Sequence, residues 1–257
     1  MASLKRLWVI GSSHANRLFA CFLTIPTLNL MYIMKNITKN GSSFSSLLPL
    51  LPDPFSFDRN DLVIVQVFGN SLFNRFVNNR KNVVFKGRQI CLKTFSPLSN
   101  EEIQNQWNLA AQFFRKLPCK ILLIDNPCRH TISDGFLNKN VYFFQKRKNL
   151  ELRNFFQTLE NVKVINHLTL LPYPRFWSKN WKNYGSLLRD SVHFHSNIYR
   201  EIALKLWSYI QTENSPLDKI PPVEPKGRAN RRKRIKRLKR IKNFELHFQH
   251  DPCKNFH

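Results

Sequence analysis

The chain has 257 residues, enough for one sizeable domain plus a tail, and its hydrophobic content of 42% is sufficient for a buried core. It carries 41 Lys and Arg residues against 16 Asp and Glu residues, which gives a formal net charge of +25. No apolar stretch reaches the length of a membrane span, and the chain runs into a predicted strand at Leu7 without the regions of a signal peptide. Five cysteines at irregular spacing match no metal-binding pattern and indicate reduced thiols. Composition therefore favours an intracellular protein, cytoplasmic or nuclear, that attracts polyanions.

Strands and helices are predicted to alternate along most of the chain. Apolar runs predict strands at 7–10, 28–34, 62–67, 119–125 and 162–166. Helices are predicted at 15–23, 43–51, 100–117, 136–159 and 197–212, with a hairpin at 83–95 and an aromatic loop at 168–189. This alternation predicts an α/β fold, a three-layer sandwich with a mostly parallel central sheet, covering residues 1–213. Ligands of such folds bind at the carboxyl ends of the strands.

The composition of the chain changes after residue 213. Prolines at 216, 221, 222 and 225 predict an extended linker over 214–225, followed by a basic tail over 226–257 that is expected to be disordered. The tail contains eleven positive charges and no acid between 226 and 242, and the rest of the chain still carries +14. We expect the tail to bind nucleic acid, and RNA is favoured over DNA. An anionic membrane surface is the second possible partner. The residues expected to contact phosphates are Arg228, Arg231, Arg232, Lys233, Arg234, Lys236, Arg237, Lys239, Arg240 and Lys242. A solvent-exposed helix or a nuclear localisation signal would show the same pattern of charges.

Polar motifs lie just beyond three of the predicted strands. Gly11-Ser12-Ser13 follows the first strand, Gly41 follows the second, and Phe68-Gly69-Asn70-Ser71 follows the third. The chain has only 7 glycines, yet three of them lie at these turns, where the backbone must turn sharply or approach a ligand. A further motif, Asp190-Ser191-Val192-His193, precedes the last predicted helix.

These motifs supply the groups needed for nucleophilic catalysis. Ser13 would expose a hydroxyl beside the N–H groups of a helix N-terminus, His193 could act as a base, and Asp190 could orient it. Each residue also has an ordinary structural role: a helix cap for Ser13, backbone hydrogen bonding for Asp190, loop packing for His193 and a turn for Asn70. His193 and His195 could form a metal pair, but no third ligand is evident, so no metal is expected.

The same motifs resemble the SGNH (GDSL-type) hydrolase superfamily in order and spacing, from about Lys5 to Trp207. The resemblance implies that Ser13 is the nucleophile, His193 the base and Asp190 its partner. It also implies an oxyanion hole formed by Gly41, Asn70 and the Ser13 N–H, and no metal or organic cofactor. The chain departs from the family pattern where Ser12 and Ser71 replace aspartates and where Phe68 replaces the leading glycine of the third motif.

Two functions follow from the resemblance and the charge. The first is a serine esterase that hydrolyses a small acyl ester and carries a basic nucleic-acid-binding tail. The alternative is a catalytically idle SGNH-like domain that acts as an RNA- or DNA-binding module. SGNH-like domains beside basic segments occur in mobile-element (retrotransposon-like) and RNA-associated proteins, and this chain is similar to them in arrangement.

Overall fold

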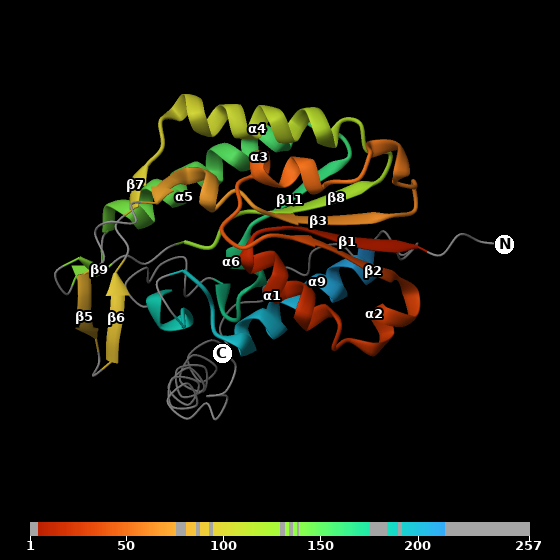
Figure 1. Ribbon diagram of the computed structural model, residues 1–257. Helices are drawn as coiled ribbons and strands as arrows, with labels where there is room; N and C mark the ends of the chain where they lie inside the picture. Colours follow the sequence, from red (N-terminus) through yellow and green to blue (C-terminus); the bar gives the residue numbers. More distant parts are fainter. Residues whose placement is uncertain are drawn as a thin grey trace, which may run out of the picture. The chain divides into compact units, whose positions relative to one another are not determined.

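Five parallel strands form the central sheet of the computed structural model (Figure 1). They are β1 (Arg6–Gly11), β2 (Ile33–Thr38), β3 (Leu62–Gln66), β8 (Lys120–Ile124) and β11 (Val162–Ile165), in the order β11-β8-β3-β1-β2. Gly11 at the end of β1 is aligned with Thr38 on one side and with Gln66 on the other. The carboxyl ends of β1, β2 and β3 therefore meet at one edge, and the loops that follow them are neighbours. The predicted α/β class with a parallel sheet is confirmed.

The structure describes residues 5–75, 81–85, 88–92, 95–128, 132–133, 136–137, 139–174, 184–189 and 192–213. All of them belong to one compact unit, Met1–Asn214. The predicted linker and basic tail, Asp190 and Ser191 lie outside the described residues. No helix in the described part of the chain is long and apolar enough to cross a membrane.

The three central strands owe their positions to continuous apolar sequence. Every residue of β3 is buried, and in β1 and β8 only the first residue is not. Strands buried on both faces have this kind of sequence, because helices cover the sheet above and below. β2 forms one edge of the sheet and is mostly exposed or half-buried.

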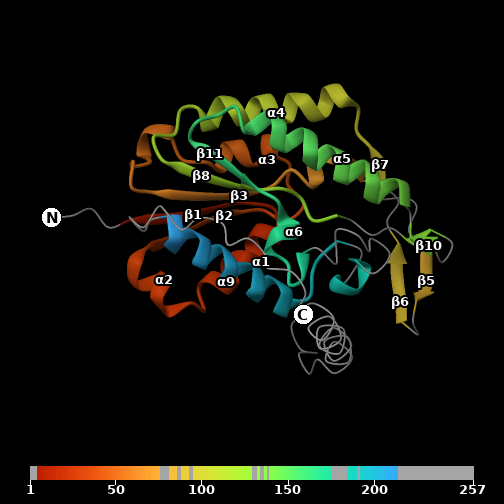
Figure 2. The ribbon, with the colours of Figure 1, turned by 180° about the vertical axis from the view of Figure 1, so that it is seen from behind.

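Helices form the two outer layers of the sandwich (Figures 1 and 2). One face is covered by α3 (Phe44–Leu47), α4 (Asn100–Phe114) and α5 (Lys139–Phe156). The other face is covered by α1 (Ser13–Phe22), α2 (Pro26–Met31) and α9 (Ser196–Glu213), with α1 packed against α9. The core under α4 is rich in aromatic rings, with Phe44, Phe68, Phe114 and Phe156 in mutual ring contact.

The N-terminus of α4 is capped as its sequence predicts. The Ser99 hydroxyl accepts a hydrogen bond from the Glu102 N–H at 3.2 Å, and the Glu102 carboxylate accepts one from the Ser99 N–H at 2.9 Å. The hydrogen bonds that the Ser99 N–H and the Ser99 hydroxyl donate to the Glu102 carboxylate favour its charged form and lower the pKa of Glu102.

The prediction of a strand over 28–34 is wrong in part. Residues Pro26–Met31 form α2, and the strand is β2, which starts only at Ile33. Pro26 occupies the first turn of α2, where its missing N–H costs nothing, and Leu28 is buried beneath the helix. Apolar content alone did not separate this short helix from the strand that follows it.

The connections add several small elements. The predicted hairpin is present, as β5 (Lys81–Phe85) pairs antiparallel with β6 (Arg88–Leu92), and β4 (Phe73–Arg75) pairs with β7 (Phe95–Pro97). The helix predicted to start at 136 starts at Lys139, because Phe136–Leu137 forms β10, paired with β9 (Ile132–Ser133). The region of the predicted aromatic loop includes α6 (His167–Leu170) and a 3-10 turn at Gly185–Leu187, while residues 175–183 lie outside the described part.

Candidate active site

Ser13 is the first residue of α1, immediately after the turn that ends β1. The turn passes so close to β3 that a Cβ atom on Gly11 would lie 2.1 Å from the Gln66 carbonyl oxygen, so only glycine fits there. The Ser12 N–H donates a hydrogen bond of 3.1 Å to that same carbonyl. The position of Ser13 is therefore fixed by the backbone of the neighbouring strand.

The N-terminal turn of α1 lies beside the Ser13 side chain. Ser12 is the N-cap residue, but its side chain makes no capping hydrogen bond. The N–H groups of the first turn are thus not taken up by their own cap, and the positive end of the helix dipole lies at this position. Such a helix end stabilises negative charge on a nearby oxygen.

His193 lies on a short antiparallel turn just before α9. The Arg189 N–H donates to the His193 carbonyl at 2.7 Å, and the His195 N–H donates to the Leu187 carbonyl at 3.1 Å. Leu187 and Phe194 are fully buried and anchor the two arms of this turn in the core. The arms therefore hold the His193 side chain in one place.

The structure brings Ser13 and His193 together although 180 residues separate them. The Oγ atom of Ser13 and the Nε2 atom of His193 are 2.8 Å apart, within hydrogen-bond distance, and both side chains are half-buried. This is the distance at which an imidazole can take a proton from a hydroxyl. Asp190, predicted to orient the imidazole, lies outside the described residues.

Asn70 and Gly41 lie in the loops that follow β3 and β2. The Nδ2 amide of Asn70 donates a hydrogen bond of 3.1 Å to the Ser42 carbonyl, which joins the two loops. Gly41 has a φ of 74°, in the left-handed region that favours glycine. The loops after β1, β2 and β3 thus carry Ser13, Gly41 and Asn70 on three adjacent strands.

A cavity of about 340 Å³ opens beside Asn70. Its lining is mostly hydroxyl and amide side chains, with one carboxylate and two apolar residues: Ser43, Asn70, Ser71, Phe73, Leu98, Glu102, Asn105 and Gln106. Among the described residues of the predicted site, only Asn70 lines this cavity, and Ser13, Gly41 and His193 do not line it.

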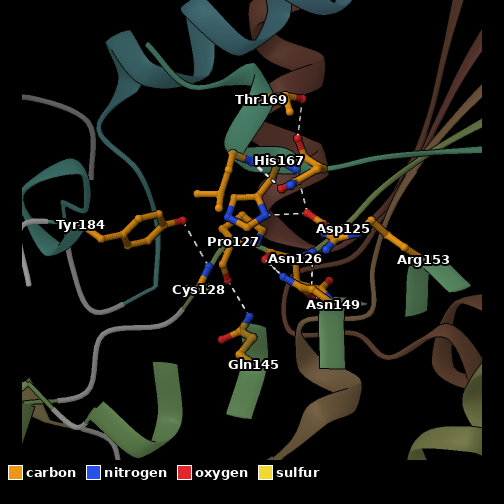
Figure 3. A network of polar contacts seen from close by, with 12 residues as sticks. Asp125, Asn126, Pro127, Cys128, Gln145, Asn149, Arg153, His167, Thr169 and Tyr184 are labelled. Atoms are coloured by element: carbon orange, nitrogen blue, oxygen red, sulfur yellow. Dashed lines mark hydrogen bonds and ion pairs between the residues drawn. The ribbon is translucent and has the colours of Figure 1, made fainter. Parts of the chain in front are cut away.

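A buried polar network, which sequence reasoning missed, occupies the ends of β8 and β11 (Figure 3). The Asp125 carboxylate accepts a hydrogen bond from the His167 N–H at 2.7 Å, lies 2.5 Å from Nδ1 of the same histidine, and forms an ion pair with Arg153. Asp125 and His167 are almost fully buried, and the Nε2 atom of His167 has no hydrogen-bond partner in the described structure. The signal for this network was an aspartate at the end of an apolar strand and a histidine at the start of a short helix.

The network continues into the loops of the candidate site. Asn126 exchanges hydrogen bonds with Asn149 (Figure 3). The Asn126 side chain also lies about 3.5 Å from the point where a Cβ of Gly69 would be. Tyr184 accepts a hydrogen bond from the Cys128 N–H at 3.2 Å, and its ring contacts that of Phe194. Burial raises the pKa of the Cys128 thiol and of the Tyr184 hydroxyl far above their ordinary values, so both stay protonated. We interpret the network as support for the loops that carry Asn70 and His193.

Within the described ranges, no three His, Cys, Asp or Glu side chains gather as a metal site would require.

Two solved structures share this fold. That of an acetyl xylan esterase, AlAXEase, matches 80% of this chain and 99% of its own, with a TM-score of 0.55 and 17% identity. That of protein YXIM from Bacillus subtilis matches 82% of this chain and 57% of its own, with a TM-score of 0.51 and 11% identity. This chain thus corresponds to only a little over half of the second protein. No protein-family model and no curated protein matches the sequence.

The strand order and these two likenesses define the fold. The chain has the fold of the SGNH-type hydrolases, and the fold that the motifs predicted is confirmed. At identities of 17% and 11%, the likeness concerns the fold and leaves the chemistry to the side chains of this chain.

Proposed function

We propose that this chain is a serine esterase that hydrolyses small O-acyl esters. The observation that carries the proposal is the distance of 2.8 Å between Ser13 Oγ and His193 Nε2 at the carboxyl edge of a parallel sheet. The fold is compatible with this chemistry, because an acetyl xylan esterase has it too.

The reaction would proceed through an acyl-enzyme. His193 Nε2 takes the proton of the Ser13 hydroxyl as Oγ attacks the ester carbonyl, and the imidazolium then gives that proton to the departing alcohol. Water attacks the acyl-serine in the second half, with His193 again acting as base, and releases the carboxylic acid and free Ser13. Asp190 is proposed to hold the imidazole in the tautomer that this exchange requires.

The negative oxygen of each tetrahedral intermediate must be stabilised by hydrogen-bond donors. We propose that the Ser13 N–H, the Gly41 N–H and the Asn70 side chain supply them. The alignment of β1, β2 and β3 and the uncapped first turn of α1 support this assignment.

A fluorophosphonate ester tests the proposal without knowledge of the natural substrate, because it labels only activated serines. Wild type should be labelled and should hydrolyse a short-chain aryl acetate. Ser13→Ala should abolish both, since loss of one member of such a site costs about 10⁴-fold. Ser12→Ala is the matched control, because Ser12 is adjacent, buried and makes no side-chain cap, and it should keep most of the labelling. Labelling that persists in Ser13→Ala would contradict the assignment.

We propose nucleic acid as the partner of the basic tail. In the alternative function, the hydrolase site is catalytically idle and the whole chain acts as an RNA- or DNA-binding module. The charge of +25 supports a polyanionic partner. The domain adds a surface on α5, where Phe143, Lys146, Arg147 and Leu150 share one exposed helical face. Exposed aromatic and basic side chains side by side suit single-stranded nucleic acid.

Charge replacement in the full-length chain tests this partner. A variant with Arg231, Arg232, Lys233 and Arg234 changed to Gln should bind single-stranded RNA more weakly. Its log–log salt slope should flatten by about 0.7 for each phosphate that the tail no longer neutralises. Esterase activity should not change. Equal affinity and equal salt slope in both proteins would contradict nucleic-acid binding by the tail and would leave it the role of a localisation signal.

We also propose that the protein is intracellular. The free thiols of Cys21, Cys119 and Cys128 support this proposal.

A further inference from the structure

The residue after the proposed nucleophile is a buried histidine, and none of the roles assigned above includes it. His14 is the second residue of α1 and is only 8% exposed. Its Nδ1 atom shares a hydrogen bond of 2.6 Å with the Tyr199 hydroxyl, a bond that is buried and joins residues 185 positions apart. A buried hydrogen bond between α1 and α9 fixes the relative position of the two helices at this level.

The His193 ring lies against His14. The ring centroids of His14 and His193 are 5.2 Å apart, with an angle of 40° between the planes. Phe194 makes edge contacts with both His14 and Tyr199, at centroid distances of 6.0 and 5.7 Å. Rings from α1 and from the start of α9 therefore lie on one side of the His193 imidazole.

We propose that His14 and Tyr199 are positioning residues that hold the His193 imidazole over Ser13 in the esterase reaction. The proposal rests on the proposed function. Ser13 and His193 belong to separate segments, and their 2.8 Å contact depends on how α1 lies against the turn before α9. The His14–Tyr199 bond fixes that relationship one residue away from Ser13 and six residues after His193. Small misplacements of reacting groups cost much of the rate, so a bond at this place affects turnover more than substrate affinity.

Tyr199→Phe is the direct test, because it removes one hydroxyl and keeps the ring that packs on Phe194. We expect kcat for an aryl acetate to fall about 10-fold, with KM within about two-fold of wild type. The second-order rate of fluorophosphonate labelling should fall by the same factor as kcat.

Thr27→Val is the matched control. It removes the acceptor of the hydrogen bond from Trp207 Nε1, 3.1 Å long, which also joins α9 to the N-terminal part of the chain, away from Ser13. This variant tests whether any weakened attachment of α9 lowers activity, and it should keep the wild-type kcat. A pair of histidine variants adds a rescue test. His14→Asn keeps a hydrogen-bonding group near the place of Nδ1 and should retain more kcat than His14→Leu.

The outcomes separate the two proposals. If wild type neither hydrolyses the ester nor reacts with the fluorophosphonate, the proposed function fails, and the positioning role fails with it. If wild type is active and Tyr199→Phe keeps the wild-type kcat, or loses it only as much as Thr27→Val does, the positioning role alone is overturned.

Discussion

The side-chain amide of Asn70 donates a hydrogen bond to the backbone carbonyl of Ser42 at 3.1 Å. This bond joins the loop after β3 to the loop after β2, the two loops that flank Ser13. Asn70 also lines the polar cavity of about 340 Å³. One side chain thus belongs both to the proposed oxyanion donors and to the lining of this cavity.

Replacing Asn70 by Ala should lower kcat by about 10²- to 10³-fold, because an oxyanion donor acts mainly in the transition state. Steady-state kinetics on an aryl acetate measures this effect. Asn105→Ala removes another amide from the same cavity, away from Ser13 and His193, and should leave kcat near wild type. Equal kcat in wild type and Asn70→Ala would exclude Asn70 from the oxyanion hole.

Gly11 and Gly69 offer a matched pair of glycine substitutions. A Cβ at Gly11 would lie 2.1 Å from the Gln66 carbonyl oxygen and 2.7 Å from the Ala15 Cβ, so Gly11→Ala should lower the free energy of unfolding by about 3 kcal/mol or more. A Cβ at Gly69 would lie 3.5 Å from the Asn126 side chain, with an ordinary helical φ of −60°. Gly69→Ala should therefore change stability by less than about 1 kcal/mol. Urea unfolding of the two variants compares them directly, and similar losses would refute the close approach at Gly11.

The ion pair of Asp125 with Arg153 is largely buried, since the two side chains are 0% and 22% exposed. Asp125→Ala would leave the guanidinium and the His167 N–H without this acceptor, and should cost about 3 kcal/mol of unfolding free energy. Asp58→Ala removes an Arg6 partner that is 62% exposed and should cost less than about 1 kcal/mol. Comparable losses in the two variants, measured by urea unfolding, would contradict a structural role for the network.

Stability at alkaline pH should depend on Cys119. Burial, aided by the nearby charge of Asp61, raises the pKa of this thiol from 9.0 to about 11. The unfolded chain therefore releases the thiol proton first, so the contribution is constant below pH 9 and stability falls as the pH rises from 9 to about 11. The loss in this window should be about 2 kcal/mol. Unfolding curves of wild type and Cys119→Ala between pH 8 and pH 11 should converge as the pH rises, whereas parallel curves would show that Cys119 does not titrate in this way.

The parts of the fold that were predicted correctly depend on local sequence. Leu62–Gln66 is β-branched and apolar, and such a run forms a strand in the middle of a sheet in nearly any context. Ser99 with Glu102 specifies a helix start within four residues. By contrast, α2 is too short for its period to be visible, and the boundary between Met31 and Ile33 depends on packing against β1.

In the candidate site, too, some residues could be predicted from local sequence and others could not. The motif around Ser13 was visible because it occurs in family order with the Asn70 and Asp190–His193 motifs, whereas a serine in such a turn is by itself an ordinary helix cap. His14 and Tyr199 were not visible, because each looks like an ordinary member of a helix until α1 and α9 are packed together. The partnership of Asp125 with His167 likewise exists only after β8 and β11 have paired.

The contact between Ser13 and His193 joins the beginning of the domain to its last turn before α9. During synthesis, a ribosome carries the proposed nucleophile for nearly the whole length of the domain before the base emerges. No N-terminal fragment of the nascent chain that ends before His193 contains both groups. Under the proposed function, hydrolysis would therefore begin only when the domain has been synthesised and closed, and activity would serve as a readout of completed folding.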